Sequence, residues 1–330
     1  GGIDTENWAL LNESLDRPML NRALRGTYPP GSTYKPFMAI AGLESGKRTV
    51  DTTIQDNGSW TFGGHTFRSG HPNGPTNLRR AIIKSSNVYF YMLANDMGVD
   101  LMHEWLAPMG FGQPSGIDLR GEARGVLPST EWKRNTYKRP EQKKWYAGET
   151  ISLGIGQGYN NFTILQLADA MAMLANHGVK NQPQLGLGRI DAVTREYQAL
   201  PREAPKPMGY KSANVEAVRS AVSAVTVEGT ARGVFAGAGY LSAGKTGTAQ
   251  AVGVRQNEKY NAARLTEYQR DHSLYVAYAP ADNPTIALAV IVENAGFGAA
   301  AAAPIARRVM DYWLLGRYPS EEDIAAVRKG

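Results

Sequence analysis

The stretch YPPGSTYKPFMAIAGLESG, residues 28–46, carries the clearest structural signal in the chain. It predicts a helix that begins at Ser32 and ends at the stop signal Gly46. Pro36 is compatible with this helix because the backbone N–H groups of a first turn have no intrahelical acceptor. Residues three apart share a helix face, so Lys35 can reach the Ser32 hydroxyl. The pattern Ser-x-x-Lys at a helix N-terminus therefore indicates a serine nucleophile with a lysine beside it.

The chemistry of such a pair sets two conditions. Ser32 lies at the positive end of the predicted helix, which favours an alkoxide and a developing oxyanion. Lys35 can act as a base only when neutral, and lowering its pKa from about 10.4 to near 7 takes roughly 4–5 kcal/mol. Burial and a second ammonium group nearby can supply that free energy. Lys245 is the candidate for the second charge.

A second short motif, Ser85-Ser86-Asn87, supplies partners for the nucleophile. Its pattern is Ser-x-Asn. We expect Ser85 to relay a proton to the leaving group, and Asn87 to hold an amide of the substrate.

The third motif, Lys245-Thr246-Gly247-Thr248, is interpreted as an edge strand. Gly247 allows a substrate backbone to approach closely, because it has no side chain. The charge of Lys245 and the hydroxyls of Thr246 and Thr248 suit a terminal carboxylate. We expect the N–H groups of Ser32 and Thr248 to form an oxyanion hole, in which losing one donor typically costs about 3–4 kcal/mol.

Periodicity and turn residues divide the rest of the chain into helices followed by strands. Further helices are predicted over residues 78–98 (capped by Asn77), 99–109, 163–176, 214–227 and 299–315. Strands are predicted over residues 245–251, 274–279 and 285–292, as neighbours in an antiparallel sheet. Residues 51–77 are interpreted as an irregular insertion, and residues 111–150 as a long loop. The fold class is therefore α+β, an antiparallel sheet flanked by helices, with a mainly helical subdomain at roughly residues 45–210.

Composition narrows the possible functions. The 330 residues contain no Cys, which excludes disulfides, a thiol nucleophile and a Cys-ligated metal. The longest apolar run, residues 286–292, is far shorter than the roughly 20 residues of a membrane span. The opening residues do not form a signal peptide, so we expect any native anchor to lie outside this sequence. The net charge is +6 and residues 133–144 are strongly basic, yet no nucleic-acid-binding fingerprint accompanies them.

Three other motifs need separate consideration. Residues 239–246 match the P-loop pattern G-x-x-x-x-G-K-[ST], which requires a helix beginning at Lys245, whereas a strand-like sequence follows. The glycines of residues 154–158 lack the acidic residue of a dinucleotide site and are better interpreted as a glycine-rich active-site loop. His103 and Glu104 begin an H-E-x-x-H pattern, but Ala107 takes the place of the second histidine.

Ser-x-x-Lys, Ser-x-Asn and Lys-Thr-Gly in this order are the known signature of class A β-lactamases and penicillin-binding proteins. The chain resembles the transpeptidase domain of class B penicillin-binding proteins over essentially all of its 330 residues, as one domain. The runs YPPGSTYKP and GIGQGY favour the cell-elongation subfamily. The segments that carry the resemblance are residues 22–46, 84–98, 145–161 and 243–250.

The resemblance implies a penicilloyl-serine-transferase (β-lactamase-like) fold and D,D-transpeptidation of peptidoglycan stem peptides, without a cofactor. Ser32 would attack the penultimate D-Ala carbonyl, and β-lactam antibiotics would acylate the same residue. The implied location is the periplasmic side of the inner membrane, with the family's anchor and pedestal outside this sequence. The implied partners are a SEDS-family glycosyltransferase and other elongation-complex proteins.

The resemblance leaves some alternatives open. A serine β-lactamase or a D,D-carboxypeptidase would keep Ser32 and Lys35 but admit water to the acyl-enzyme. A penicillin sensor with an inactive site is a non-enzymatic alternative. Some members of the elongation subfamily carry zinc near the insertion, where Asp51, Asp56, His65 and His71 are candidate ligands here, but the residues alone do not assign a metal.

Overall fold

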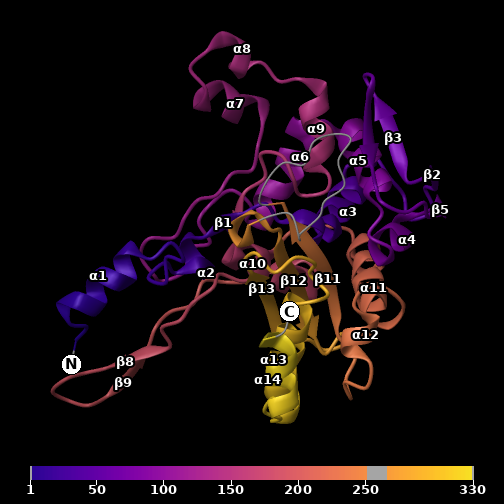
Figure 1. Cartoon of the computed structure of the whole chain (residues 1–330). Helices are drawn as coiled ribbons and strands as arrows, with labels where there is room; N and C mark the ends of the chain where they lie inside the picture. Colours follow the sequence, from indigo (N-terminus) through magenta and orange to yellow (C-terminus); the bar gives the residue numbers. More distant parts are fainter. Residues whose placement is uncertain (1, 251–265, 329–330) are drawn as a thin grey trace.

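A computed structural model describes residues 2–250 and 266–328. Its central sheet is antiparallel, in the order β11 (Ala243–Ala249), β12 (His272–Ala279) and β13 (Ile286–Val292). These are the three strands that the sequence predicts, although Ala251, the end of the first prediction, lies outside the described residues. Three helices pack against the sheet, namely α10 (Ile164–Ala175), α11 (Ser212–Glu228) and α13 (Ala302–Leu315). Figure 1 shows the strands at the centre of the molecule, with α11 beside β11.

Residues 28–46, which carry the Ser-x-x-Lys motif, form a buried helix, α3 (Lys35–Glu44), preceded by a 3₁₀ turn, η1 (Gly31–Tyr34). The predicted helix is thus confirmed, with its first turn wound more tightly. All residues of α3 up to Leu43 are buried. A helix that is apolar on every side needs partners all round, and α3 packs against α11, α4 (Leu78–Ile83), α5 (Asn87–Met97) and α6 (Val99–Leu106).

The prediction of a single helix over residues 78–98 is wrong, because the structure has two helices there, α4 and α5, separated by a turn. Ser85 takes the left-handed conformation, with φ at 56°. Asn77 caps α4 as expected, accepting from the N–H of Arg80 at 3.0 Å. The Ser86 hydroxyl starts α5 by accepting from the N–H of Tyr89 at 3.2 Å. Serine competes for backbone hydrogen bonds in this way, which favours a new cap over a continuous helix.

The insertion at residues 51–77 is not irregular, and that prediction is wrong as well. It contains two antiparallel pairs, β2 (Ile54–Asp56) with β5 (Gly74–Thr76), and β3 (Ser59–Phe62) with β4 (His65–Arg68). Gly63 and Gly64 both have positive φ, as a two-residue hairpin turn requires.

Residues 111–150, predicted as a loop, contain short helices. These are α7 (Thr130–Thr136), α8 (Pro140–Lys143) and the start of α9 (Ala147–Leu153). The arm that carries α7 and α8 projects at the top of Figure 1. Lys133 links α7 to α9, because its buried ammonium group donates to both carboxylate oxygens of Glu149, at 2.5 and 2.6 Å.

The remaining elements are short or peripheral. Residues 45–210, assigned from the sequence to a helical subdomain, also contain the two strand pairs of the insertion and α10, which packs on the sheet. Among the described helices, none is long and apolar enough to cross a membrane. The other elements are α1 (Thr5–Glu13), α2 (Arg22–Arg25), β1 (Thr27–Tyr28) paired with β6 (Phe162–Thr163), β7 (Val179–Lys180) with β10 (Lys206–Pro207), β8 (Gly188–Ile190) with β9 (Tyr197–Ala199), α12 (Arg232–Phe235) and α14 (Glu321–Arg328).

Candidate active site

The three sequence motifs meet at one cleft of about 420 Å³. Ser32 comes from η1, Ser85 from the turn between α4 and α5, and Asn87 from the first residue of α5. Residues 246–248 come from β11, which packs against η1. Lys35 and Lys245 lie behind this surface and are fully buried. The fold thus brings together all eight predicted site residues.

Lys35 is directed at the Ser-x-Asn motif. Its ammonium group donates to the Ser85 carbonyl oxygen at 2.8 Å, the Ser85 hydroxyl at 3.1 Å and Asn87 Oδ1 at 2.6 Å. Burial places the pKa of Lys35 well below its ordinary value, and the positive charge of Lys245 lowers it further. Both causes are those the sequence predicts for a lysine that acts as a base.

Lys245 meets Lys35 at a shared partner. Its ammonium group donates to the Ser85 hydroxyl at 2.9 Å and to the Thr246 carbonyl oxygen at 3.0 Å. Burial lowers the pKa of Lys245 to about 7. Lys245 is fully buried beneath the cleft and does not line it, whereas Thr248 is one of the lining residues.

Ser32 is held between β11 and the glycine-rich loop by close backbone contacts. The N–H of Gly31 donates to the Gly156 carbonyl oxygen at 3.0 Å, and a Cβ atom on Gly31 would collide with the Thr248 carbonyl oxygen. A Cβ atom on Gly247 would lie 2.7 Å from Thr33 Cγ2 and 2.9 Å from Thr33 N. These glycines let the backbones of Ser32 and Thr248 line the same cleft, as the predicted oxyanion hole requires.

Further cleft residues were not predicted individually. Gln157 donates from Nε2 to the Thr248 carbonyl oxygen at 3.1 Å, which confirms the glycine-rich loop as part of the site. Thr230 shares a 2.8 Å hydrogen bond with the Thr246 hydroxyl. Arg68 brings a cationic side chain from β4. In the sequence, the glycine spacing of residues 154–158 pointed to the loop that carries Gln157, and no pattern pointed to Thr230 or Arg68. The other additions to the lining are Tyr91, Ile155, Gln250, Asp271 and residues 297–299.

One candidate metal ligand of the insertion, Asp56, is hydrogen-bonded to neutral groups. Within residues 2–250 and 266–328, no three His, Cys, Asp or Glu side chains gather as a metal site would need. The Asp56 carboxylate instead accepts three hydrogen bonds, from the Ser86 hydroxyl at 2.6 Å, the Asn73 amide at 2.7 Å and the Gly58 N–H at 2.8 Å. Neutral donors therefore occupy the buried carboxylate that a cation would use.

The P-loop interpretation is excluded by the fold. Lys245 and Thr246 lie inside β11 and pair with Val276 and Tyr275 of β12, so no helix begins at the lysine. A phosphate-binding loop needs that helix N-terminus.

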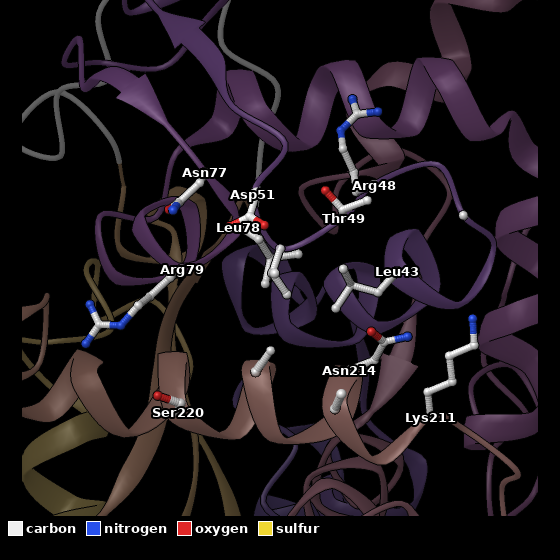
Figure 2. A pocket seen from close by; sticks show the side chains of 14 residues that line it. Leu43, Arg48, Thr49, Asp51, Asn77, Leu78, Arg79, Lys211, Asn214 and Ser220 are labelled. Carbon is white, nitrogen blue, oxygen red and sulfur yellow. The ribbon is translucent and has the colours of Figure 1, made fainter.

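A larger cavity, of about 670 Å³, lies away from the motif residues. Figure 2 shows Leu43 of α3, Leu78 of α4 and Asn214 of α11 around it, with Asp51 beside Leu78 and Lys211 to the right of Asn214. None of its described lining residues belongs to the three motifs. Size alone therefore does not identify the active site of this molecule.

The comparisons with known proteins agree with this geometry. The family model "Penicillin binding protein transpeptidase domain" matches residues 4–311. The peptidoglycan D,D-transpeptidase MrdA of Haemophilus influenzae is 44% identical over 329 residues, which cover 97% of this chain and 50% of the relative. MrdA of Escherichia coli is 38% identical over 324 residues, covering 96% and 50%. The chain thus spans about half the length of these curated relatives.

Solved structures show the same similarity. PBP2 of Pseudomonas aeruginosa in complex with WCK 5153 is 41% identical, with a TM-score of 0.83 over 97% of this chain and 67% of that chain. PBP2 of Helicobacter pylori in complex with MreC is 27% identical, with a TM-score of 0.81 over 96% and 55%.

Proposed function

The chain belongs to the penicillin-binding protein transpeptidase domain family, and from this premise we propose that it is a peptidoglycan D,D-transpeptidase acting in cell elongation. The observation that carries the proposal is the convergence of two buried lysines on the Ser85 hydroxyl, beside Ser32 in one cleft. That arrangement provides a nucleophile, a base with a lowered pKa and a proton relay.

The first half of the reaction forms an acyl-enzyme. The Ser32 oxygen attacks the carbonyl carbon of the penultimate D-Ala of a stem peptide, and its proton passes to neutral Lys35. The peptide C–N bond then breaks, and the leaving D-Ala nitrogen takes a proton through Ser85. In this structure the Lys35 side-chain nitrogen donates to Ser85. The neutral amine must therefore turn toward the Ser32 hydroxyl to accept its proton in the first transfer.

The backbone of the cleft stabilises the charge that develops. The N–H groups of Ser32 and Thr248 are proposed to bind the oxyanion, because preorganised donors act strongly where water is excluded. The hydroxyls of Thr246 and Thr248 are proposed to bind the terminal carboxylate, with Lys245 as the positive charge behind them. Asn87 is proposed to hold a substrate amide.

The second half of the reaction transfers the acyl group. An amine of a neighbouring stem peptide attacks the ester carbon and gives up one proton to neutral Lys35. The Ser32–acyl bond then breaks, and the Ser32 oxygen takes up that proton as the new amide is released. A β-lactam acylates Ser32 in the same way, but its ring-opened amine stays attached. The acyl-enzyme therefore persists when water is a poor acceptor.

We further propose a location and partners for the whole protein, which the complexes of two solved relatives support. One solved relative is PBP2 bound to MreC, and another is part of a peptidoglycan synthase complex of polymerization and crosslinking. We propose that the whole protein is anchored in the inner membrane, with this domain in the periplasm. There it would work with elongation-complex proteins and a SEDS-family glycosyltransferase.

The experiment is a turnover assay with a stem pentapeptide that ends in D-Ala-D-Ala and a D-amino acid as acceptor amine. The proposal expects release of D-Ala together with an exchanged product that carries the acceptor, and no reaction with Ser32→Ala. Release of D-Ala with only the hydrolysed peptide would show a D,D-carboxypeptidase instead. Lack of D-Ala release, with wild-type protein that is folded, would contradict the proposed activity.

A further inference from the structure

The insertion at residues 51–77 contacts the Ser-x-Asn motif through a fully buried carboxylate. Asp56, at the end of β2, accepts from the Ser86 hydroxyl at 2.6 Å. The same hydroxyl accepts from the N–H of Tyr89 and so caps α5. One side chain therefore joins the insertion to the turn that presents Ser85 and Asn87.

Two other contacts link the insertion to the same turn. The N–H of Asn87 donates to the Ser69 hydroxyl at 3.1 Å, and the Tyr91 hydroxyl donates to the Arg68 carbonyl oxygen at 3.2 Å. Helix periodicity continues through this turn, although a serine can also begin a new helix cap. A non-glycine residue with positive φ persists only when its surroundings fix it, and Ser85 is such a residue.

We propose that Asp56 is a positioning residue of this active site, which acts through Ser86 to hold Ser85 and Asn87 against Lys35. This inference rests on the proposed function. Asp56 is fully buried and is not one of the residues that line the cleft. Its remaining hydrogen bonds, from Asn73 and Gly58, tie the carboxylate to other parts of the insertion, so that the anchor is rigid.

The charge of Asp56 has a separate effect from its hydrogen bonds. Two charged groups act on buried Lys35, namely Lys245 from β11, which lowers its pKa, and Asp56 from β2, which raises it. Removing the negative charge therefore lowers the pKa of Lys35 still further, because an anion nearby favours the protonated lysine. The pH dependence of acylation therefore reports the charge of Asp56, because a purely structural role of Asp56 would leave the pKa of Lys35 unchanged.

The test compares Asp56→Asn and Ser86→Ala with wild-type protein, using the acylation rate constant for a fluorescent penicillin as a function of pH. Asp51→Asn is the matched control, since Asp51 is an exposed carboxylate at the start of the same insertion. Thermal melting of each variant measures the fraction that is folded, and rates are expressed per folded protein. Ser86→Thr keeps the hydroxyl and serves as the conservative variant.

We expect Ser86→Ala to lower the acylation rate constant on the order of tenfold to a hundredfold, the effect of misplacing catalytic groups by about 1 Å. Ser86→Thr should restore most of that rate. Asp56→Asn should also lower the acylation rate constant. In addition, it should shift the rise of this rate constant with pH, which reports deprotonation of Lys35, to lower pH. Asp51→Asn should change neither the rate constant nor its pH dependence.

The inference is overturned if Asp56→Asn, corrected for folding, shows the wild-type rate and the wild-type acidic limb. It is also overturned if Ser86→Ala acylates as fast as Ser86→Thr. If the wild-type protein itself is not acylated, the proposed function fails, and that outcome is distinguishable because it does not depend on any variant.

Discussion

Lys35 and Lys245 donate to the same Ser85 hydroxyl, at 3.1 and 2.9 Å, and both are fully buried. Burial lowers the pKa of both lysines, and the positive charge of Lys245 lowers that of Lys35 further. The pKa of Lys35 is well below its ordinary value, and that of Lys245 is lowered to about 7. The site therefore holds a neutral base next to a lysine that titrates near neutrality.

The first prediction concerns the pH dependence of acylation. The rate constant for a β-lactam should rise with pH as Lys35 loses its proton, because only the neutral amine accepts the Ser32 proton. It should fall again above about pH 7 as Lys245 loses the charge that supports Ser85 and the substrate carboxylate. Stopped-flow acylation across the pH range measures both limbs, and a flat profile would contradict the assignment of the two lysines.

A second prediction concerns stability. The pKa of folded Lys245 is about 7, below its ordinary 10.5, so between these pH values the unfolded chain binds more protons than the folded chain. The free energy of unfolding should therefore rise with pH in this window, by up to about 1.4 kcal/mol per pH unit for one such group. Urea denaturation at neutral and alkaline pH should show this rise in the wild type, and a smaller rise in Lys245→Met. Equal slopes would show that Lys245 is not the group responsible.

A third prediction separates close backbone contact from backbone strain. Gly156 and Gly158 both have φ at +71°, so an alanine at either position meets a similar conformational penalty, about 1–2 kcal/mol. At Gly156 the new Cβ atom would also collide with the Gly31 carbonyl oxygen and lie 2.8 Å from Gly31 N. At Gly158 it would lie 3.2 Å from Leu153 Cδ2, a side-chain atom that can move.

Gly156→Ala should therefore displace the turn that holds Ser32 and lower the acylation rate at least tenfold more than Gly158→Ala, an extra transition-state cost of about 1.4 kcal/mol or more. The measurement is the acylation rate constant of both variants, with melting temperatures to verify folding. Comparable rates in the two variants would mean that the Gly31–Gly156 contact does not position the nucleophile.

Much of this site could be predicted from the sequence because its parts are local. The turn and helix around Ser32, the strand that carries Lys245 and the glycines at close contacts each leave a short pattern of residue types. Their meeting in one cleft follows from the order of the motifs and a known signature. The lowered pKa of Lys35 was predictable too, since the chemistry needs a neutral amine.

The rest depends on contacts between distant segments. The Ser86 hydroxyl that caps α5 also donates to Asp56, thirty positions earlier in the chain. Helix periodicity continues through residues 78–98, and no local rule reports a buried acceptor from elsewhere. The strand pairs of the insertion were missed because their strands are only three or four residues long. Arg68 and Thr230 enter the cleft through packing of separate elements, which has no signature in either segment.

The most direct measurement of the central claim is intact-mass spectrometry of the wild type and Ser32→Ala after addition of a penicillin. The account predicts one adduct per chain that persists for hours in the wild type and is absent from the variant. A wild-type chain without any adduct, or an adduct that remains in Ser32→Ala, would contradict Ser32 as the acylated nucleophile. An adduct that forms and clears within minutes would contradict the transpeptidase and indicate a β-lactamase.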